Sequence, residues 1–360
     1  MIERPYLVFV AIAVLLAAIA WSAPTLGTAT DRGAYEATAS RFIVNDCSDL
    51  HCFRVLVPWV LGPLPGSSIV KWKAYAVIAN TLAAAAVYAL SITWGLSAAA
   101  AVMAAVISAF GFGSLYTLFD PFTSDPLMYA LGPFLVWLLL RDRVAIAGVF
   151  AAIGVLAKEF AAAPMLIFAA ATAASGRWLA ALRIIGFANV ALIVWLTLQL
   201  VLIIKFNYSY AGNQSTHLLS GAYLGYWLSR QSWVVSAQAI YGEFAMLWLL
   251  APAGWFLASA PLRRFAIASI PVALVFAYVQ QPDRALWNFH FIAAPLAALV
   301  LDRAPAMAAW ACIATFAAAN FRLGGQLAFA PPARGSLVVS ALIAIGCLYG
   351  MRRSAPAVAS

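Results

Sequence analysis

Charge is scarce in this sequence: Asp, Glu, Lys and Arg make up 9% of its 360 residues, whereas hydrophobic residues make up 65%. Soluble domains are about half apolar and about a quarter charged, so this composition excludes an ordinary soluble protein. The sequence also has no long polar segment in which a sizeable soluble domain could lie. We therefore expect residues 1–360 to form a single integral membrane domain.

The alternation of polar and apolar residues that a membrane β-barrel needs is absent as well. Ala, Leu, Val and Ile instead recur in runs of helix length. These runs predict an all-α polytopic bundle of about 11–13 transmembrane helices. No internal repeat is evident, which weakens the case for a transporter built from repeated halves. The predicted spans lie near residues 6–23, 74–94, 96–115, 125–140, 144–157, 160–175, 184–204, 244–260, 265–280, 289–301, 304–321 and 336–351.

The basic residues are spread over short loops, so the net charge of +9 indicates no nucleic-acid partner. Short cytoplasmic loops are usually rich in arginine and lysine, and this rule predicts a cytoplasmic N-terminus. The first 23 residues resemble a signal peptide, but many apolar spans follow, so we expect a retained first helix. The basic residues then predicted inside are Arg4, Arg141, Arg143, Arg177, Arg183, Arg263, Arg264, Arg303, Arg352 and Arg353.

In this topology the extracytoplasmic side receives all three histidines and every acidic residue except Glu3, Asp142 and Asp302. Two long loops lie there. Residues 24–73 contain FRVLVPWVLGPLP, which is too short to span and is broken by prolines, so we expect interfacial helices in this loop. Residues 205–243 are rich in Tyr, Trp, Asn, Gln and Ser, a composition that suits membrane anchoring and carbohydrate stacking equally.

Cysteine is rare, and two of the four cysteines lie close together in CSDLHC. In an oxidising compartment Cys47 and Cys52 could form a disulfide-closed turn, and free thiols are the alternative. His51 lies between them, but the ligand spacing for zinc is incomplete. Cys312 and Cys347 fall within predicted spans, where we expect them to fill the core.

Three acidic residues on the extracytoplasmic side each admit two interpretations. Asp31, in TATDRGAYEATASRF, is either the N-cap of a surface helix beginning near Arg32 or a general base for an acceptor hydroxyl. Asp120 and Asp125, in FDPFTSDPLMYAL, are each followed by proline, as at a helix start. Asp125 fits both a cap and a site wall. Asp120 has no long helix to cap, so we favour a functional role for it.

Lys158 and Glu159 lie between apolar segments with no other polar residue nearby. Charge at membrane depth is costly and usually marks an ion pair or a site. Adjacent residues on a helix point in different directions, so each is expected to find its own partner, such as Asp120 or Arg284.

The segment QQPDRALWNFHFIAAP places Asp283, Arg284 and His290 just before the tenth predicted span. An ordinary solvated loop would account for these residues. A phosphate site would also account for them, because arginine binds phosphate oxygens in pairs. Four extracytoplasmic connections thus carry carboxylates and cations to one membrane level, where a lipid-borne phosphate would present its head group.

These motifs resemble the GT-C fold, the fold of multispanning glycosyltransferases that use polyprenyl-phosphate-linked sugars. The resemblance is carried by an acidic residue in the first outer loop, by DPFTSDPLMYALG, and by LAKEFAAAP with its Pro164. It covers residues 1–170 by pattern and the remainder by topology. The acids are spaced D-x4-D rather than D-x-D, which departs from the motif with which some members bind a metal.

The resemblance implies transfer of a sugar from a polyprenyl-phosphate donor to a glycan, lipid or protein acceptor outside the cytoplasm, in a bacterial inner membrane. Asp31 is then the general base and Asp120 a second catalytic candidate. Asp125 would bind substrate hydroxyls, and Mg or Mn, if required, would bind Asp120 and Asp125. The remaining substrate-binding candidates are Lys158, Arg284, His290 and Arg54 for the donor phosphate, with Glu159 orienting a cation.

Two other function classes remain open. A lipid-linked saccharide polymerase or flippase of envelope polysaccharide assembly would also need aromatic loops and extracytoplasmic charge. A non-enzymatic membrane scaffold would tolerate neutralising Asp31, Lys158 and Arg284 together.

Overall fold

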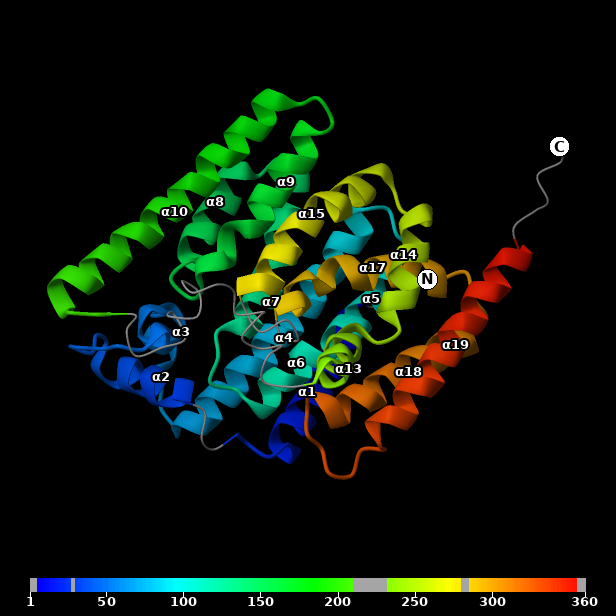
Figure 1. Ribbon diagram of the computed structural model, residues 1–360, viewed down its shortest axis with the longest axis horizontal. Helices are drawn as coiled ribbons and strands as arrows, with labels where there is room; N and C mark the ends of the chain where they lie inside the picture. Colours follow the sequence, from blue (N-terminus) through cyan, green and yellow to red (C-terminus); the bar gives the residue numbers. More distant parts are fainter. Residues whose placement is uncertain (1–4, 27–29, 210–231, 280–284, 355–360) are drawn as a thin grey trace.

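The computed structural model describes residues 5–26, 30–209, 232–279 and 285–354, and within these ranges the chain is helical with no β-strand (Figure 1). Three short 3-10 helices, η1 (Leu50–Phe53), η2 (Glu159–Ala162) and η3 (Leu286–Phe289), accompany the α-helices. The α-helices are α1 (Pro5–Ser22), α2 (Thr30–Arg41), α3 (Leu56–Leu61), α4 (Ser68–Thr93), α5 (Ala98–Ala109), α6 (Phe112–Phe119), α7 (Asp125–Leu140), α8 (Val144–Gly154), α9 (Ala163–Ala173), α10 (Trp178–Phe206), α13 (Trp233–Phe244), α14 (Leu247–Leu257), α15 (Ala260–Val279), α17 (His290–Leu301), α18 (Ala306–Leu323) and α19 (Ala333–Ser354).

Every predicted span coincides with helix, which confirms the all-α polytopic architecture. Seven described helical segments are long and apolar enough to cross a bilayer, and α13 with α14 forms an eighth candidate that bends by 50°. The segments predicted near 125–140, 144–157, 160–175 and 289–301 form shorter apolar helices. The number of complete crossings therefore stays a prediction.

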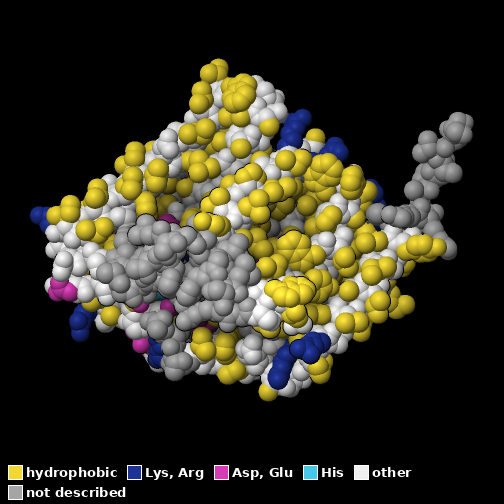
Figure 2. Space-filling view, viewed as in Figure 1, with side chains coloured by type: hydrophobic (Ala, Val, Ile, Leu, Met, Phe, Trp, Pro, Cys, Tyr) yellow, Lys and Arg dark blue, Asp and Glu magenta, His cyan; other side chains and the backbone are white. Residues whose placement is uncertain are grey.

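The surface of the bundle is apolar, as expected for an integral membrane protein. Leu179 and Ile204, near the two ends of α10, are 84% and 72% exposed. Figure 2 shows hydrophobic side chains over most of the visible face. Such exposure would be costly in water, whereas lipid tails are as apolar as these side chains.

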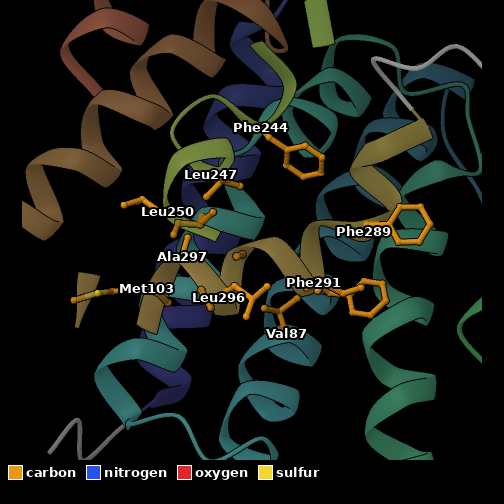
Figure 3. Packing of buried hydrophobic residues seen from close by; sticks show 14 of the residues in the cluster. Val87, Met103, Phe244, Leu247, Leu250, Phe289, Phe291, Leu296 and Ala297 are labelled. Carbon is orange, nitrogen blue, oxygen red and sulfur yellow. The ribbon is translucent and has the colours of Figure 1, made fainter. Parts of the chain in front are cut away.

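The central core lies where α4, α5, α14 and α17 meet. Val87 of α4 and Met103 of α5 pack in one buried cluster with Leu250 of α14 and Leu296 of α17 (Figure 3). Gly254 allows α14 to approach closely, because a Cβ at this position would collide with the backbone of Leu296. This contact fixes α17 against the bundle.

The η3 turn is held by the indole of Trp287. Gly111 and Gly113 lie against this ring, and a Cβ at either position would overlap it. The indole Nε1 also donates to the hydroxyl of Ser114, at 3.3 Å. The start of α17 is therefore locked against α6.

One end of the molecule carries α2, η1 and α3 and is called here the α2 end (Figure 1). The C-terminus of α10 reaches this end, where Asn207 stops the helix in a left-handed conformation (φ 56°). The Asn207 amide donates to the Asp46 carboxylate at 2.7 Å, and the Ser209 N–H donates to the Cys47 carbonyl at 2.9 Å. The first long loop is thus tied to a transmembrane helix.

Lys73 anchors the same loop from the other side. Its ammonium is buried and donates to the carbonyls of Ala20 (2.6 Å) and Ala23 (3.2 Å), just where α1 ends. Carbonyls at a helix C-terminus lack partners within the helix and favour a cation. Lys73 therefore joins α1 to α4 immediately before the chain enters α2.

Candidate active site

Acidic side chains visible in Figure 2 gather at the α2 end. Three pairs of titratable residues meet there or directly beneath it, and they come from α2, the η1 loop, the start of α7 and the turn between α8 and η2. Each pair joins segments that are distant in the sequence.

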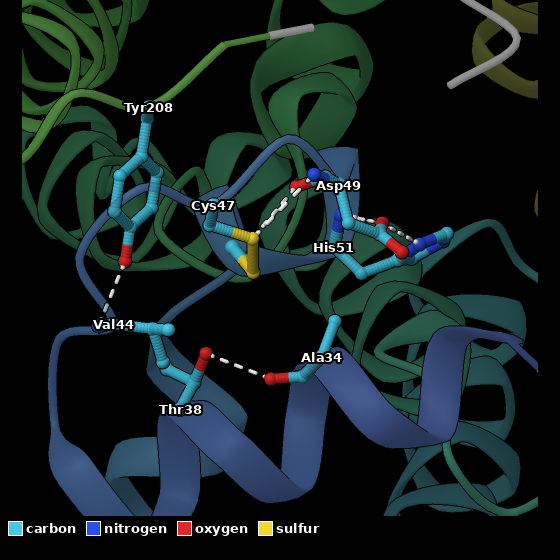
Figure 4. The surroundings of a disulfide bond; sticks show 8 residues. Ala34, Thr38, Val44, Cys47, Asp49, His51 and Tyr208 are labelled. Carbon is cyan, nitrogen blue, oxygen red and sulfur yellow. Dashed lines mark hydrogen bonds and ion pairs between the residues drawn. A yellow bond between two sulfur atoms is a disulfide. The ribbon is translucent and has the colours of Figure 1, made fainter. Parts of the chain in front are cut away.

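A disulfide joins Cys47 and Cys52 and closes the loop that carries Asp49 and His51 (Figure 4). The sequence left this pairing open, and the structure contains it. Inside the loop the Asp49 carboxylate accepts from the His51 N–H at 2.8 Å and so caps η1. The loop is therefore closed covalently and stiffened by its own capping bond.

The first pair is Asp31 with His51. Nε2 of His51 lies 3.2 Å from Oδ2 of Asp31, and Nδ1 lies 2.8 Å from Oδ1 of Asp49. Both ring nitrogens therefore face a carboxylate. Helix α2 begins at Thr30, so Asp31 lies within the first turn instead of capping a helix that begins near Arg32.

The second pair is Lys158 with Asp125. The Lys158 ammonium, 6% exposed, donates to Oδ1 of Asp125, which is 3% exposed. The sequence suggested Asp120 or Arg284 as partners for Lys158, whereas the structure supplies Asp125. Helix α7 does begin at Asp125 with Pro126 in its first turn, as the Asp-Pro pattern predicts.

The third pair is Arg54 with Glu159. The Arg54 guanidinium donates from Nε (3.3 Å) and Nη2 (2.9 Å) to the two carboxylate oxygens of Glu159. Burial opposes the charge of Arg54, but the Glu159 carboxylate more than offsets this effect and raises the arginine pKa above its usual value. A backbone hydrogen bond joins the same two segments: the Leu56 N–H donates to the Leu156 carbonyl at 3.0 Å.

Tyr35 lies among these pairs and is completely buried. Burial raises its pKa to about 12, so the phenol stays neutral and can act only as a hydrogen-bonding and packing group. Its ring packs against His51 (5.5 Å between centroids) and Trp72 (5.2 Å), and Trp72 packs against Phe122 at 5.4 Å. This aromatic layer separates α2 from the α4–α7 interface.

Tyr75 orders the segment that leads into α7. Its hydroxyl donates to the Ser124 carbonyl at 3.3 Å and accepts from the Leu127 N–H at 3.2 Å. The first turn of α7, which carries Asp125, is thereby fixed against α4.

The other candidates lie in different surroundings. Asp120 ends α6 and is 2% exposed. His290 begins α17 and is completely buried, stacked on Trp287 with Nδ1 2.8 Å from the Trp287 carbonyl, so it is a core residue in this structure. Arg284, with Asp283, lies outside the described residues.

The structure shows no preformed set of ligands for the predicted metal ion among the residues it describes. Among the residues that the structure describes, no three His, Cys, Asp or Glu side chains are grouped as metal ligands. Of the two residues named for Mg or Mn, Asp125 already binds Lys158. We therefore derive no catalytic step through a metal ion.

An apolar groove of about 620 Å³ opens between α14, α15 and α17. At one end it reaches Phe289, which also lines a small cavity of about 30 Å³ with Phe160 and Ala161. These two residues directly follow Glu159, so the small cavity lies next to the segment that carries the Arg54–Glu159 pair. Six of the residues that line the groove are Trp248, Trp255, Ile270, Ala273, Leu286 and Ala293.

No family model and no curated protein sequence matches this chain. Its structure, however, matches solved structures. ArnT from Cupriavidus metallidurans superposes with a TM-score of 0.60 over 96% of this chain and 75% of ArnT, at 13% identity. The chain has the GT-C fold. The oligosaccharyltransferase AglB from Archaeoglobus fulgidus, in complex with an inhibitory peptide and a dolichol-phosphate, superposes with a TM-score of 0.53 over 97% of this chain, at 14% identity.

The chain spans 55% of the AglB chain. The GT-C likeness nevertheless covers nearly all of this chain, although the sequence motifs carried it only over residues 1–170. Helix packing can be retained where sequence similarity has been lost, and this explains why the later spans carried no recognisable motif.

Three further buried or paired titratable residues were not singled out from the sequence. Tyr35 follows Asp31 by four positions, the helical spacing that places two side chains on one face. Glu243, in the apolar segment AIYGEFAMLWLL, is completely buried and meets the same criterion that singled out Lys158. Asp49 carried no signal by itself, because its role depends on the disulfide.

Proposed function

We propose that this protein transfers a sugar from a polyprenyl-phosphate donor to an acceptor at the α2 end, on the extracytoplasmic face of a bacterial inner membrane. The observation that carries the proposal is the pairing of Asp31 with His51 beside the Arg54–Glu159 and Lys158–Asp125 pairs, within a GT-C fold. The sugar and the acceptor are left open.

Asp31 is the proposed general base, because it is part-exposed whereas Asp125 is buried in its ion pair. It would take the proton of the acceptor hydroxyl as that oxygen bonds to the anomeric carbon. The bond between that carbon and the phosphate oxygen would break, and polyprenyl phosphate would leave with the bonding electrons. Positioning and electrostatic stabilisation would supply most of the rate enhancement.

Arg54 is the proposed donor-phosphate ligand on the described part of the chain, and Arg284 and Lys158 are further candidates. Arg54 is held by Glu159 and stays charged, so its guanidinium is oriented before the phosphate arrives. Tyr35, neutral and buried, would hold α2 at a fixed distance from this cation.

The apolar groove supports a lipid-linked donor. Its volume of about 620 Å³ lies within the range of roughly 300–1,000 Å³ typical of ligand sites, and its walls are almost entirely apolar. An isoprenoid chain in this groove would place its phosphate near Phe289 and Phe160, on the side of the cavity next to Glu159.

The proposal is tested by mass spectrometry of lipid-linked sugars and envelope glycans from cells with and without the gene. We expect one specific sugar to disappear, to return with the wild-type gene, and to stay absent with the Asp31→Asn gene. Loss of long polymers with retention of the single sugar would favour the lipid-linked saccharide polymerase. An unchanged glycan profile would contradict the transferase.

A further inference from the structure

His51 lies beside the proposed general base Asp31, although general-base catalysis by Asp31 does not itself require a histidine there. Its imidazole bridges two carboxylates, with Nε2 3.2 Å from Asp31 and Nδ1 2.8 Å from Asp49. An imidazole so placed fixes the orientation of a carboxylate, in the way that a carboxylate orients histidine in other sites.

The bridge depends on where the η1 loop is held. The Cys47–Cys52 disulfide closes the loop, and the Cys52 N–H donates to the Asp49 carbonyl at 3.1 Å. Outside the loop, Phe53 packs edge-on against Tyr208 at 5.1 Å. The disulfide is therefore the covalent restraint nearest to His51.

The same loop also leads directly to Arg54. The Arg54 N–H donates to the His51 carbonyl at 3.2 Å, so the two side chains are fixed relative to each other by one backbone turn. A movement of this turn would displace the partner of the proposed base and the proposed phosphate ligand together.

Resting on the proposed function, we propose that His51 is the positioning residue for Asp31 and that the Cys47–Cys52 disulfide makes the transfer reaction dependent on redox conditions. A dithiol such as dithiothreitol would reduce the disulfide to two thiols and become a cyclic disulfide itself, which balances two electrons and two protons. The six-residue loop would then be open, and the covalent restraint on the turn that places His51 between the two carboxylates would be lost.

All four cysteines lie within the described residues, and Cys312 and Cys347 are free and buried. A reductant therefore has one disulfide to act on in this chain. The double variant Cys47→Ser/Cys52→Ser is the matched control, because it lacks the disulfide and should not respond to the reductant.

The first arm of the test measures transfer by the purified protein in nanodiscs. His51→Phe keeps the ring packing against Tyr35 but removes both nitrogens, and we expect kcat to fall by about 10- to 100-fold, the cost of misplacing a catalytic group by roughly 1 Å. The donor KM should change little. His51→Gln retains an amide donor and should recover part of kcat. Dithiothreitol should lower kcat of the wild type and leave the double serine variant unchanged.

The second arm does not require activity. Diethyl pyrocarbonate acylates accessible imidazole nitrogens, and mass spectrometry of the peptide resolves His51 from the other two histidines. We expect slow modification in the wild type and several-fold faster modification in Asp31→Ala, in Asp49→Ala and after reduction. Equal modification rates in all four samples would contradict the placement of His51 between Asp31 and Asp49.

The two arms separate the two proposals. Labelling that behaves as expected, in a wild-type protein that transfers no sugar from any polyprenyl-phosphate donor, would refute the proposed function and leave the bridge intact. A wild-type protein that transfers sugar while His51→Phe keeps full kcat would refute the positioning role, and full kcat in the reduced form would refute the redox dependence.

Discussion

Lys158 and Asp125 form a buried ion pair although 33 positions separate them in the sequence. The pair joins the turn after α8 to the first turn of α7, and it lies next to the Arg54–Glu159 pair. Two cations and two carboxylates thus neutralise one another inside an apolar bundle, where a single uncompensated charge would be very costly.

Breaking this pair should destabilise the protein. Removing one partner of a buried pair typically costs about 3–5 kcal/mol because the other charge is left uncompensated. We expect Lys158→Met to lower the thermal unfolding midpoint strongly in detergent, and Lys158→Met/Asp125→Asn to recover part of the loss. Glu36→Gln, which removes the part-exposed pair with Arg32, should cost at most about 1 kcal/mol. A Lys158→Met variant as stable as this control would contradict the expectation.

Neutralising the proposed base should slow transfer strongly without unfolding the protein. Asp31 is part-exposed on α2, so Asp31→Asn should leave the melting temperature nearly unchanged. Loss of general-base catalysis should lower kcat by about 10²- to 10⁴-fold. Glu36→Gln on the same helix is the control and should retain activity. Full activity of Asp31→Asn would show that another group is the base.

Arg54→Lys tests the fork-shaped contact with Glu159. Lysine keeps the charge but cannot bind Glu159 through two nitrogens and still present a further donor to a phosphate. A hydrogen bond to a charged group is worth about 1.5–3 kcal/mol, so loss of one bond to the phosphate should raise the donor KM by roughly tenfold or more. Because the Arg54 pKa is raised, its charge is present below that pKa and would be lost only in strong alkali. The donor KM of the wild type should therefore show no Arg54 titration from neutral to moderately alkaline pH. An unchanged KM in Arg54→Lys would remove Arg54 from the phosphate site.

Narrowing the apolar groove should discriminate donors by lipid length. Ala293 lines the groove on α17, and Ala293→Trp should raise the KM for a long polyprenyl donor while leaving a short-chain donor unaffected. Ala86→Trp is the matched control, because it fills a different apolar hollow of about 430 Å³ against α4 and α7. Equal effects of both variants on the long donor would indicate a general packing defect.

The arrangement of helices was predictable from the sequence because hydrophobic runs are a local signal. Every predicted span coincides with a helix, whereas α13 lies almost wholly in the segment 205–243 that was predicted as a loop. The rarity of charge singled out Lys158 and Glu159 as candidate site residues. The choice of partners was not predictable. Whether Lys158 meets Asp120 or Asp125 depends on the rotation and depth of α7, and these are set by packing against α4.

The contacts of His51 with Asp31 and Asp49 were even less predictable from the sequence. CSDLHC indicated a disulfide or free thiols with equal force, and only the closed loop brings His51 to Asp31. The predicted helix was too long in one region, because the length of a hydrophobic run does not fix where the helix within it begins and ends. The run predicted at 144–157 contains α8, which has 11 residues.

The shortness of α8 and α9 limits the depth of the turn that joins them. Each helix has 11 residues and is about 16 Å long, roughly half of the 30 Å hydrocarbon core. We expect Arg143 and Arg177 at one membrane surface, and the turn that carries Lys158 and Glu159 would then lie within the bilayer, directly beneath the α2 end. A donor phosphate that meets this turn would have to arrive sideways from the lipid, along the apolar groove, while the acceptor descends from the α2 end. The two substrates would then reach the site by perpendicular routes, and neither would need to leave for the other to enter.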